Sequence, residues 1–305
     1  MKILVTGGAG FIGSHMVEHF QGRAEVRVLD NLRSGCRGNL AGLECEFIRA
    51  SILNRAAVRR AMKDVDVVFH LAAMVSVPES IRQPAVCHEI NAAGTLVVLE
   101  EAARAKARKL LFSSSAAVYG DQPGLPKLET MPPHPISPYA ITKLDGEFYC
   151  DWFTREGRLP TACLRYFNVF GPRQNPNSQY AAAVPIFLDR ATKDRLITIF
   201  GDGEQTRDFI FVKDVVAANV FLATQSAATG VFNVACGRRI TINELATKIC
   251  HLTGSRSKIK YTAERPGDVK HSAASIEKLR AAGFTPAADF DGGLRITAEC
   301  FSQNR

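Results

Sequence analysis

Tyr139 and Lys143 are the two residues whose types and spacing most directly indicate chemistry. Residues four apart lie side by side on one face of a helix, and Ser137-Pro138 is a typical helix start. A tyrosine with a pKa near 10 is a poor base at neutral pH, and lowering that pKa by roughly three units takes about 4 kcal/mol. One cation about 4 Å away supplies about that energy at an effective dielectric constant of 20. The spacing predicts a tyrosine base kept ionised by positive charge, and the alternative is a core tyrosine beside a solvent-reaching lysine.

Three consecutive serines, residues 113–115, end a segment that we expect to form a strand from residue 109. Ligands of open parallel sheets bind at the carboxyl ends of the strands, so these serines should face the ligand crevice. We expect Ser115 to hydrogen-bond the substrate oxygen from which Tyr139 takes a proton while hydride leaves the adjoining carbon. The hydride acceptor would be a nicotinamide ring, whose positive charge also favours the ionised tyrosine.

Gly7, Gly10 and Gly13 form a G-x-x-G-x-x-G pattern between a predicted strand over residues 2–6 and a predicted helix over residues 11–21. In that context the backbone N–H groups can contact a pyrophosphate, and the helix N-terminus adds positive potential. The position between a strand and a helix makes the pattern a good indicator of a dinucleotide site.

Asp30, at the end of the second predicted strand, indicates which dinucleotide is bound. A carboxylate there accepts hydrogen bonds from the adenosine ribose hydroxyls and repels a 2′-phosphate, which favours NAD over NADP. Arg33 is the one nearby feature that favours NADP, and an aspartate that only caps a turn is the alternative interpretation.

The first half of the chain alternates β-branched runs with amphipathic stretches. This alternation predicts right-handed βαβ units, and therefore a doubly wound α/β fold with a parallel sheet covered on both faces. The predicted strands are residues 2–6, 25–30, 45–49, 65–71, 109–113 and 161–165, and the predicted helical stretches include 11–21, 54–62 and 84–107.

Beyond Arg165 the predicted elements become shorter, at residues 197–200, 209–212 and 231–234. A helix should begin at Thr241, because Thr241 and Glu244 fit a capping box. We expect residues 1–168 to form a NAD-binding domain to which residues 207–234 return. Residues 169–305 would form a smaller α/β substrate domain.

Composition narrows the class of protein. The 305 residues are 46% hydrophobic and 22% charged, as in ordinary globular proteins. With no long uncharged apolar run and no leader pattern at the N-terminus, we expect a cytoplasmic protein without a membrane span. The net charge of +8 comes from dispersed residues, so we expect no nucleic-acid partner; an anionic ligand needs only two or three arginines.

Neither cysteines nor histidines predict a metal site. The eight cysteines are scattered without a C-x-x-C pair, which is typical of reduced thiols that pack as small hydrophobic residues. His15, Glu18 and His19 spell an H-x-x-E-H motif, a zinc signature. The motif lies inside the helix that the glycine loop opens, with no third ligand indicated, so we predict no metal.

Together these residues resemble the extended short-chain dehydrogenase/reductase superfamily, and within it the NAD-dependent UDP-sugar 4-epimerases. The resemblance runs nearly end to end, and its last three blocks are the most specific. The blocks are residues 7–13, 30–31, 70–73, 113–120, 139–143, 165–168, 201–208 and 265–268. It implies an isomerase that oxidises C4 of a UDP-sugar transiently with bound NAD. It also implies a homodimer packed through the helices within residues 84–107 and 138–155.

The resemblance also implies the site residues. The catalytic residues would be Ser115, Tyr139 and Lys143. The NAD contacts would be Gly7, Gly10, Phe11, Ile12, Gly13, Asp30, Asn31, Ser34, Ser51, Ile52, Leu71, Ala72, Ala73, Tyr139, Lys143 and Tyr166. The UDP-sugar contacts would be Ser76, Ser115, Tyr139, Asn168, Ala183, Val184, Arg207, Arg265, Asp268 and Ser272. Among these, Asn168 and Arg207 would hold the diphosphate with help from Arg265, and Asp268 would bind the uridine ribose.

Two small-residue positions indicate the reaction and the sugar. Dehydratases and decarboxylases of the superfamily carry acidic residues just after the catalytic serine or threonine, where this chain has Ala116-Ala117. In 4-epimerases a bulky aromatic side chain at the position of Ser272 restricts the sugar pocket, and serine leaves room for a 2-acetamido group. We therefore predict interconversion of UDP-N-acetylglucosamine and UDP-N-acetylgalactosamine, with UDP-glucose and UDP-galactose as a further pair.

Three alternatives stay open at this point. They are a net NAD-dependent nucleotide-sugar oxidoreductase, a UDP-glucuronate 4-epimerase, and a non-catalytic dinucleotide sensor.

One departure from the family pattern concerns the cofactor. Ser51 stands where the family usually has an aspartate that contacts the adenine amino group, and a serine makes a weaker contact.

Overall fold

The structure, a computed structural model, describes residues 1–176, 182–225, 227–264 and 270–303. Its centre is a seven-stranded parallel sheet in the order β11-β6-β5-β4-β1-β2-β3. The strands are β1 (Lys2–Thr6), β2 (Glu25–Asp30), β3 (Glu46–Arg49), β4 (Val67–His70), β5 (Lys109–Ser115), β6 (Thr161–Tyr166) and β11 (Gly230–Val234). The chain winds outward in both directions from β1, which confirms the predicted doubly wound α/β fold.

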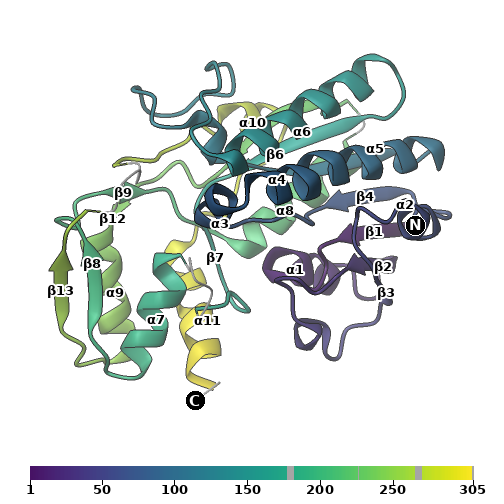
Figure 1. The fold of residues 1–305 in the computed structure, drawn as a ribbon. Coiled ribbons are helices and arrows are strands. Elements are labelled where there is room, and N and C mark those ends of the chain that lie inside the picture. Colours follow the sequence, from purple (N-terminus) through teal and green to yellow (C-terminus); the bar gives the residue numbers. More distant parts are fainter. Residues whose placement is uncertain (177–181, 226, 265–269, 304–305) are drawn as a thin grey trace.

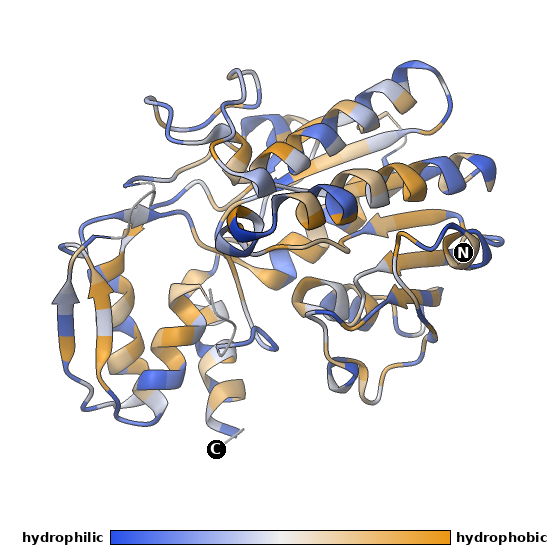
Figure 2. Cartoon of the chain, viewed as in Figure 1, coloured by the Kyte–Doolittle hydropathy of each residue, from blue (hydrophilic) through white to orange (hydrophobic). Residues whose placement is uncertain are grey.

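Helices cover both faces of this sheet (Figure 1). One face carries α1 (Phe11–His19) and α8 (Val212–Thr224), and the other carries α2 (Arg55–Ala61), α5 (Gly94–Arg104) and α6 (Pro138–Arg155). Successive side chains of a strand point to opposite faces, so Ile3 and Val5 belong to one hydrophobic core and Leu4 to the other. Burial on both sides explains why the strands of the sheet are mostly apolar, as Figure 2 shows.

The structure divides the segment that we predicted as one helix over residues 84–107. It contains α4 (Pro84–His88), a π-helical turn η2 (Glu89–Ala93) and then α5. A π turn makes i→i+5 hydrogen bonds and therefore shifts the faces that the following side chains occupy. The backbone stays helical through such a turn, so the prediction of helical structure over this segment holds although the helix is divided.

A smaller α/β part lies beside the sheet, at the left of Figure 1. It contains β8 (Ile197–Phe200), β13 (Ile259–Thr262), α7 (Ala183–Thr192), α9 (Ile242–Thr253) and α11 (Phe290–Gln303), which share a separate hydrophobic core. Thr241 and Glu244 form the predicted capping box at the start of α9. The remaining elements are α3 (Val77–Arg82), α10 (Glu277–Ala281), η1 (Arg37–Leu40), η3 (Ala116–Tyr119), β7 (Val169–Phe170), β9 (Thr206–Arg207), β10 (Ile210–Phe211) and β12 (Ile240–Thr241). Over the described ranges, no helix has both the length and the apolar character needed to cross a membrane.

Candidate active site

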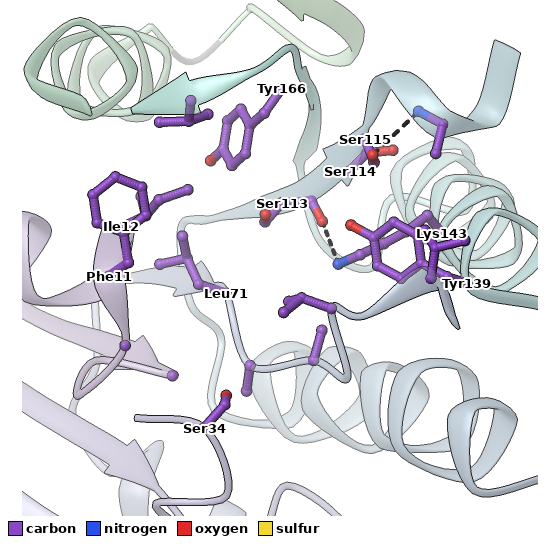
Figure 3. Close-up of a pocket in the computed structure, with 18 of the residues that line it drawn as sticks. Phe11, Ile12, Ser34, Leu71, Ser113, Ser114, Ser115, Tyr139, Lys143 and Tyr166 are labelled. Atoms are coloured by element: carbon purple, nitrogen blue, oxygen red, sulfur yellow. Dashed lines mark hydrogen bonds between the residues drawn. The ribbon is translucent and has the colours of Figure 1, made fainter. Parts of the chain in front are cut away.

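A cavity of about 950 Å³ opens at the carboxyl ends of β1, β2, β4, β5 and β6. Figure 3 shows side chains from distant parts of the chain around this space, among them Phe11 from α1, Tyr139 from α6 and Tyr166 from β6. The cavity is lined by every residue that the resemblance assigned to catalysis or to NAD. Of the assigned UDP-sugar contacts, Asn168, Arg207 and Ser272 line it as well.

The glycine loop brings bare backbone to the cavity wall. Gly7 has a φ of +72°, which side-chain-bearing residues rarely adopt, and a Cβ added to Gly13 would lie 2.2 Å from the Gly7 carbonyl oxygen. Asp30 holds the same loop, because its Oδ2 accepts a hydrogen bond from the Ala9 N–H at 3.0 Å while its Oδ1 accepts one from Leu32 at 2.7 Å. A helix N-terminus without side chains, with a carboxylate beside it, fits the pyrophosphate and ribose of a dinucleotide.

The start of α6 fixes the position of Tyr139. Ser137 caps the helix by accepting a hydrogen bond from the Ala140 N–H at 3.2 Å, and Pro138 occupies the first turn, where no N–H is needed. The backbone N–H of Tyr139 donates to Ser80 Oγ at 3.1 Å, which ties this turn to α3. The predicted helix start at Ser137-Pro138 is therefore confirmed.

Tyr139, Lys143 and the end of β5 form one cluster. The Tyr139 phenol lies close enough to the Ser115 hydroxyl for that hydroxyl to lower its pKa. Lys143 Nζ donates to the carbonyl oxygen of Ser113 at 2.6 Å (Figure 3). The Lys143 ammonium lies 5.8 Å from the centre of the Tyr139 ring. A hydroxyl group that entered between Tyr139 and Ser115 would therefore meet both a proton acceptor and a hydrogen-bond donor.

Burial changes the acid–base properties of this cluster. It raises the pKa of Tyr139, with the Ser115 hydroxyl acting in the opposite direction. Burial also lowers the pKa of Lys143 to about 8. The sequence predicts only that positive charge favours the tyrosinate, and the structure adds the opposing effect of burial. Positive charge from Lys143 and from a bound nicotinamide must first overcome the burial of the phenol.

Behind the cluster, His70 connects β1 to the helical layer. Its Nδ1 lies 2.7 Å from Thr6 Oγ1 and its Nε2 lies 3.0 Å from Thr95 Oγ1. Burial, together with the charge of Lys143, lowers the pKa of His70 to about 3, so the ring is neutral at neutral pH. His70 is therefore a structural hydrogen-bonding residue next to the cofactor loop.

Asn91 is a residue near the site that sequence reasoning missed. It lies in the π turn, and its Nδ2 donates to Met74 O at 3.0 Å and to Thr142 Oγ1 at 3.1 Å. Its Oδ1 accepts from the Met74 N–H at 2.7 Å, and Thr142 in turn donates to the Tyr139 carbonyl at 2.9 Å. Asn91 thus holds the loop after β4 against the first turn of α6. The only available signal was an asparagine within an apolar helical pattern.

A buried ion pair holds α6 against the sheet. Arg165 Nε and Nη2 bind Glu147 Oε1 and Oε2 at 2.8 and 2.7 Å, and both side chains are 4% exposed. Ser114 Oγ donates to the same carboxylate at 2.5 Å. This two-point geometry fixes the distance between α6 and β5, and therefore the place of Tyr139 relative to Ser115.

Part of the cavity wall is formed by Asn168, Arg207 and Ser272, which come from three separate segments. Asn168 Nδ2 donates to the Asp208 carbonyl at 3.1 Å, and the Ser272 N–H donates to Thr206 O at 3.0 Å. These bonds join three separate segments around one opening, as a diphosphate site requires.

Three of the implied UDP-sugar contacts do not line the cavity. Ser76 is the N-cap of α3, and its hydroxyl accepts from the Glu79 N–H at 3.1 Å. Ala183 and Val184 begin α7 and pack into the smaller core, where Val184 is fully buried. Arg265 and Asp268 lie outside the described residues.

The histidines of the H-x-x-E-H motif, His15 and His19, make hydrogen bonds within the protein. Among the residues that the structure describes, no group of three or more His, Cys, Asp or Glu residues could hold a metal ion. His15 is buried and bonds to the carbonyl of Pro172 at 2.9 Å. The eight cysteines, all within the described ranges, form no disulfide with one another.

Comparisons with known proteins agree with this geometry. The model of the NAD dependent epimerase/dehydratase family matches residues 3–235. A putative UDP-glucose 4-epimerase of Methanocaldococcus jannaschii is 37% identical over 305 residues, and the alignment covers 99% of each chain. The solved UDP-N-acetylglucosamine 4-epimerase of Methanobrevibacter ruminantium M1, in complex with UDP-N-acetylmuramic acid, is similar at a TM-score of 0.96 and 41% identity, covering 100% of this chain and 99% of that one. The solved UDP-glucose 4-epimerase of Thermotoga maritima with UDP-glucose is similar at a TM-score of 0.95 and 40% identity. The similarity covers 100% of this chain and 99% of that one.

Proposed function

The chain belongs to the NAD dependent epimerase/dehydratase family, and we propose that it interconverts UDP-N-acetylglucosamine and UDP-N-acetylgalactosamine. It is a UDP-sugar 4-epimerase with NAD as its cofactor, like relatives that align with nearly its whole length. The choice of the N-acetylated pair is the proposed part, and UDP-glucose with UDP-galactose forms a second proposed pair.

The position of Ser272 carries the proposal. Ser272 lines the same cavity as Ser115 and Tyr139, so the volume beside it is available to the sugar. A serine leaves space for a 2-acetamido group that a bulky aromatic side chain would fill. The similarity to a solved UDP-N-acetylglucosamine 4-epimerase supports the same choice.

In the proposed mechanism Tyr139 accepts the proton of the sugar 4-hydroxyl while Ser115 hydrogen-bonds the same oxygen. The chemistry that bound NAD supplies is acceptance of hydride from C4 and its later return. The 4-keto sugar turns over before Tyr139 gives the proton back to its oxygen, so the net change is inversion at C4. Ala116 and Ala117 provide no acid or base for elimination from the keto sugar. Asn168 and Arg207 are proposed to hold the diphosphate.

Product analysis by NMR tests the proposal. The purified protein is incubated separately with UDP-N-acetylglucosamine, UDP-glucose and UDP-glucuronate, and absorbance at 340 nm is followed in parallel. We expect inversion at C4 without net NADH. Ser272→Tyr should lose most turnover of the acetylated sugar, whereas the control Ser272→Ala keeps it. Unchanged turnover in Ser272→Tyr contradicts the sugar choice, and sustained NADH accumulation contradicts epimerisation.

A second candidate substrate, UDP-glucuronate, is favoured by Lys127. This lysine is 4% exposed and lines the cavity, and its Nζ donates to the Gln122 carbonyl. Burial lowers the pKa of Lys127, because a desolvated ammonium is disfavoured, and the charge of Asp121 acts in the opposite direction. A carboxylate on the sugar would be a further anion for this ammonium. The glucuronate arm of the NMR experiment distinguishes the two candidates.

We also propose a cytoplasmic homodimer, in which α6 contributes to the interface. Ile141, Phe148 and Trp152 lie on α6 with exposed fractions of 54%, 62% and 40%. Ile141 and Phe148 are seven residues apart, and Phe148 and Trp152 are four apart, so all three side chains lie on the same face of the helix. Large apolar side chains that share an exposed face favour association with a second copy.

A further inference from the structure

The loop after β7 is joined to the cofactor helix through His15. In Figure 1 the chain beyond β7 passes beside α1, and His15 Nε2 lies 2.9 Å from the carbonyl oxygen of Pro172. The other ring nitrogen, Nδ1, lies 2.5 Å from Arg173 Nη2. His15 is 5% exposed, so both contacts are shielded from water.

These two contacts select one form of the His15 ring. A carbonyl oxygen only accepts, so Nε2 must carry the proton, and a guanidinium only donates, so Nδ1 must be the acceptor. The neutral ring with the proton on Nε2 satisfies both partners at once. Glu18 Oε2 lies 3.3 Å from Nδ1, and it and the Pro172 carbonyl favour the charged ring. Burial, together with the charge of Arg173, outweighs them and lowers the pKa of His15 to about 4, so the ring is neutral at neutral pH.

Arg173 is held in an unusual backbone conformation by the same contacts. Its φ is +64°, in the left-handed region that residues with a Cβ rarely adopt. Its guanidinium also pairs with Glu18, one turn beyond His15, and its Nη1 donates to the Asn39 carbonyl at 3.4 Å. A strained residue persists where its surroundings hold it, and such sites gather at functional positions.

Both ends of this connection reach the cavity. On the helix side, Phe11 lines the cavity and contacts the His15 ring edge-on, with ring centres 5.9 Å apart. On the loop side, Gln174 and Asn175 follow Arg173 directly and line the same cavity. The backbone that presents Gln174 and Asn175 is therefore held by α1 as well as by β7, whose Phe170 is buried in the smaller core.

We propose that His15 and Arg173 are positioning residues that hold residues 171–176 against α1 and so set the affinity for the UDP-sugar. In this proposal two residues of the H-x-x-E-H pattern, His15 and Glu18, contact Arg173 of the loop, whereas His19 does not. The inference rests on the proposed function only in that the uridine nucleotide must contact this loop. Neither residue touches the reacting atoms.

Binding of UDP to the NAD-loaded protein tests this inference without requiring turnover. His15→Leu removes both ring contacts, whereas His15→Gln keeps an N–H donor and an oxygen acceptor on one group. His19→Leu is the matched control, because His19 belongs to the same motif and helix but bonds to Arg23 at the surface. Calorimetry gives the UDP affinity, and NAD content and thermal unfolding are measured on the same samples.

We expect His15→Leu to weaken UDP binding about tenfold, equivalent to about 1.4 kcal/mol. His15→Gln should stay within about threefold of the unmodified protein, and His19→Leu should match it. The kcat at saturating UDP-sugar should change less than about threefold, because Tyr139 and Ser115 do not move. Arg173→Met tests the same contact from the loop if His15→Leu does not fold.

Unchanged UDP affinity in both His15→Leu and Arg173→Met overturns the inference. So does an equal loss of UDP affinity in His19→Leu, or a fall in kcat as large as the loss of affinity, because either result indicates a general structural defect. Normal UDP binding by a protein that epimerises no UDP-sugar contradicts the proposed function and leaves this inference standing.

Discussion

Replacing Lys143 with methionine tests how the buried tyrosine becomes a base. The Lys143 Nζ lies 5.8 Å from the centre of the Tyr139 ring. At that separation and an effective dielectric constant of 20, Coulomb's law gives an interaction of about 3 kcal/mol between the ammonium and a tyrosinate. This corresponds to about two pKa units. Lys143→Met should therefore lower the rate at neutral pH about 100-fold, with little change in UDP affinity.

The same variant should change the pH dependence of the rate. With the pKa of Lys143 lowered to about 8 and that of Tyr139 raised, the pair as a whole loses its first proton near pH 8. The form with a tyrosinate and a charged lysine has the same number of protons as the form in which both are neutral. The rate of the unmodified enzyme should therefore rise with pH and level off above about pH 8. Lys143→Met should keep rising about tenfold per pH unit well beyond that point.

Initial rates with NAD-loaded protein across about pH 6 to pH 10 check both expectations. Lys63→Met is a suitable control, because Lys63 is exposed and lies on the α2 side of the sheet. The reasoning is wrong if Lys143→Met keeps its rate within about threefold of the unmodified enzyme. It is also wrong if the two pH profiles run parallel, because then the ammonium does not determine the ionisation of Tyr139.

Three further predictions follow from the same geometry. Tyr139→Phe removes the proton acceptor and should lower the rate about 10³-fold while calorimetry shows unchanged UDP binding; a loss of tenfold or less would mean that another group takes the proton. Arg165→Met leaves the buried Glu147 carboxylate without its partner and should lower the free energy of unfolding, measured by urea titration, by about 3–5 kcal/mol. A loss below about 1 kcal/mol would mean that the pair is not buried as described. Phe148→Glu introduces a charge on the exposed apolar face of α6 and should convert a dimer into monomers by light scattering, whereas a dimer that persists would exclude this face from the interface.

How much could be predicted from the sequence depends on whether a feature leaves a periodic signal. β8 was predicted at residues 197–200 and is found there, because a short run rich in β-branched residues between turns indicates a strand. The π turn at residues 89–93 is too short to be told from an α-helix by apolar spacing, because it adds one residue within a continuous helical segment. Asn91 lies in this turn, and its partners Met74 and Thr142 are distant in sequence, so its contacts could not be predicted. The hydroxyl of Ser76 caps α3, and its assignment to the sugar stays a prediction.

The spacing of four that identified Tyr139 and Lys143 extends one step further in the structure. Glu147, the next residue on that face of α6, accepts a hydrogen bond from Ser114, while Tyr139 lies close to the Ser115 hydroxyl and Lys143 donates to the Ser113 carbonyl. One helix face thus contacts three consecutive residues of β5. A glutamate in a helix usually predicts an exposed position, so the third contact could not be recognised without its buried partner Arg165. These three contacts between α6 and β5 together position Tyr139. Changes at Glu147 or Arg165 should therefore alter the geometry of Tyr139, although neither residue lines the cavity.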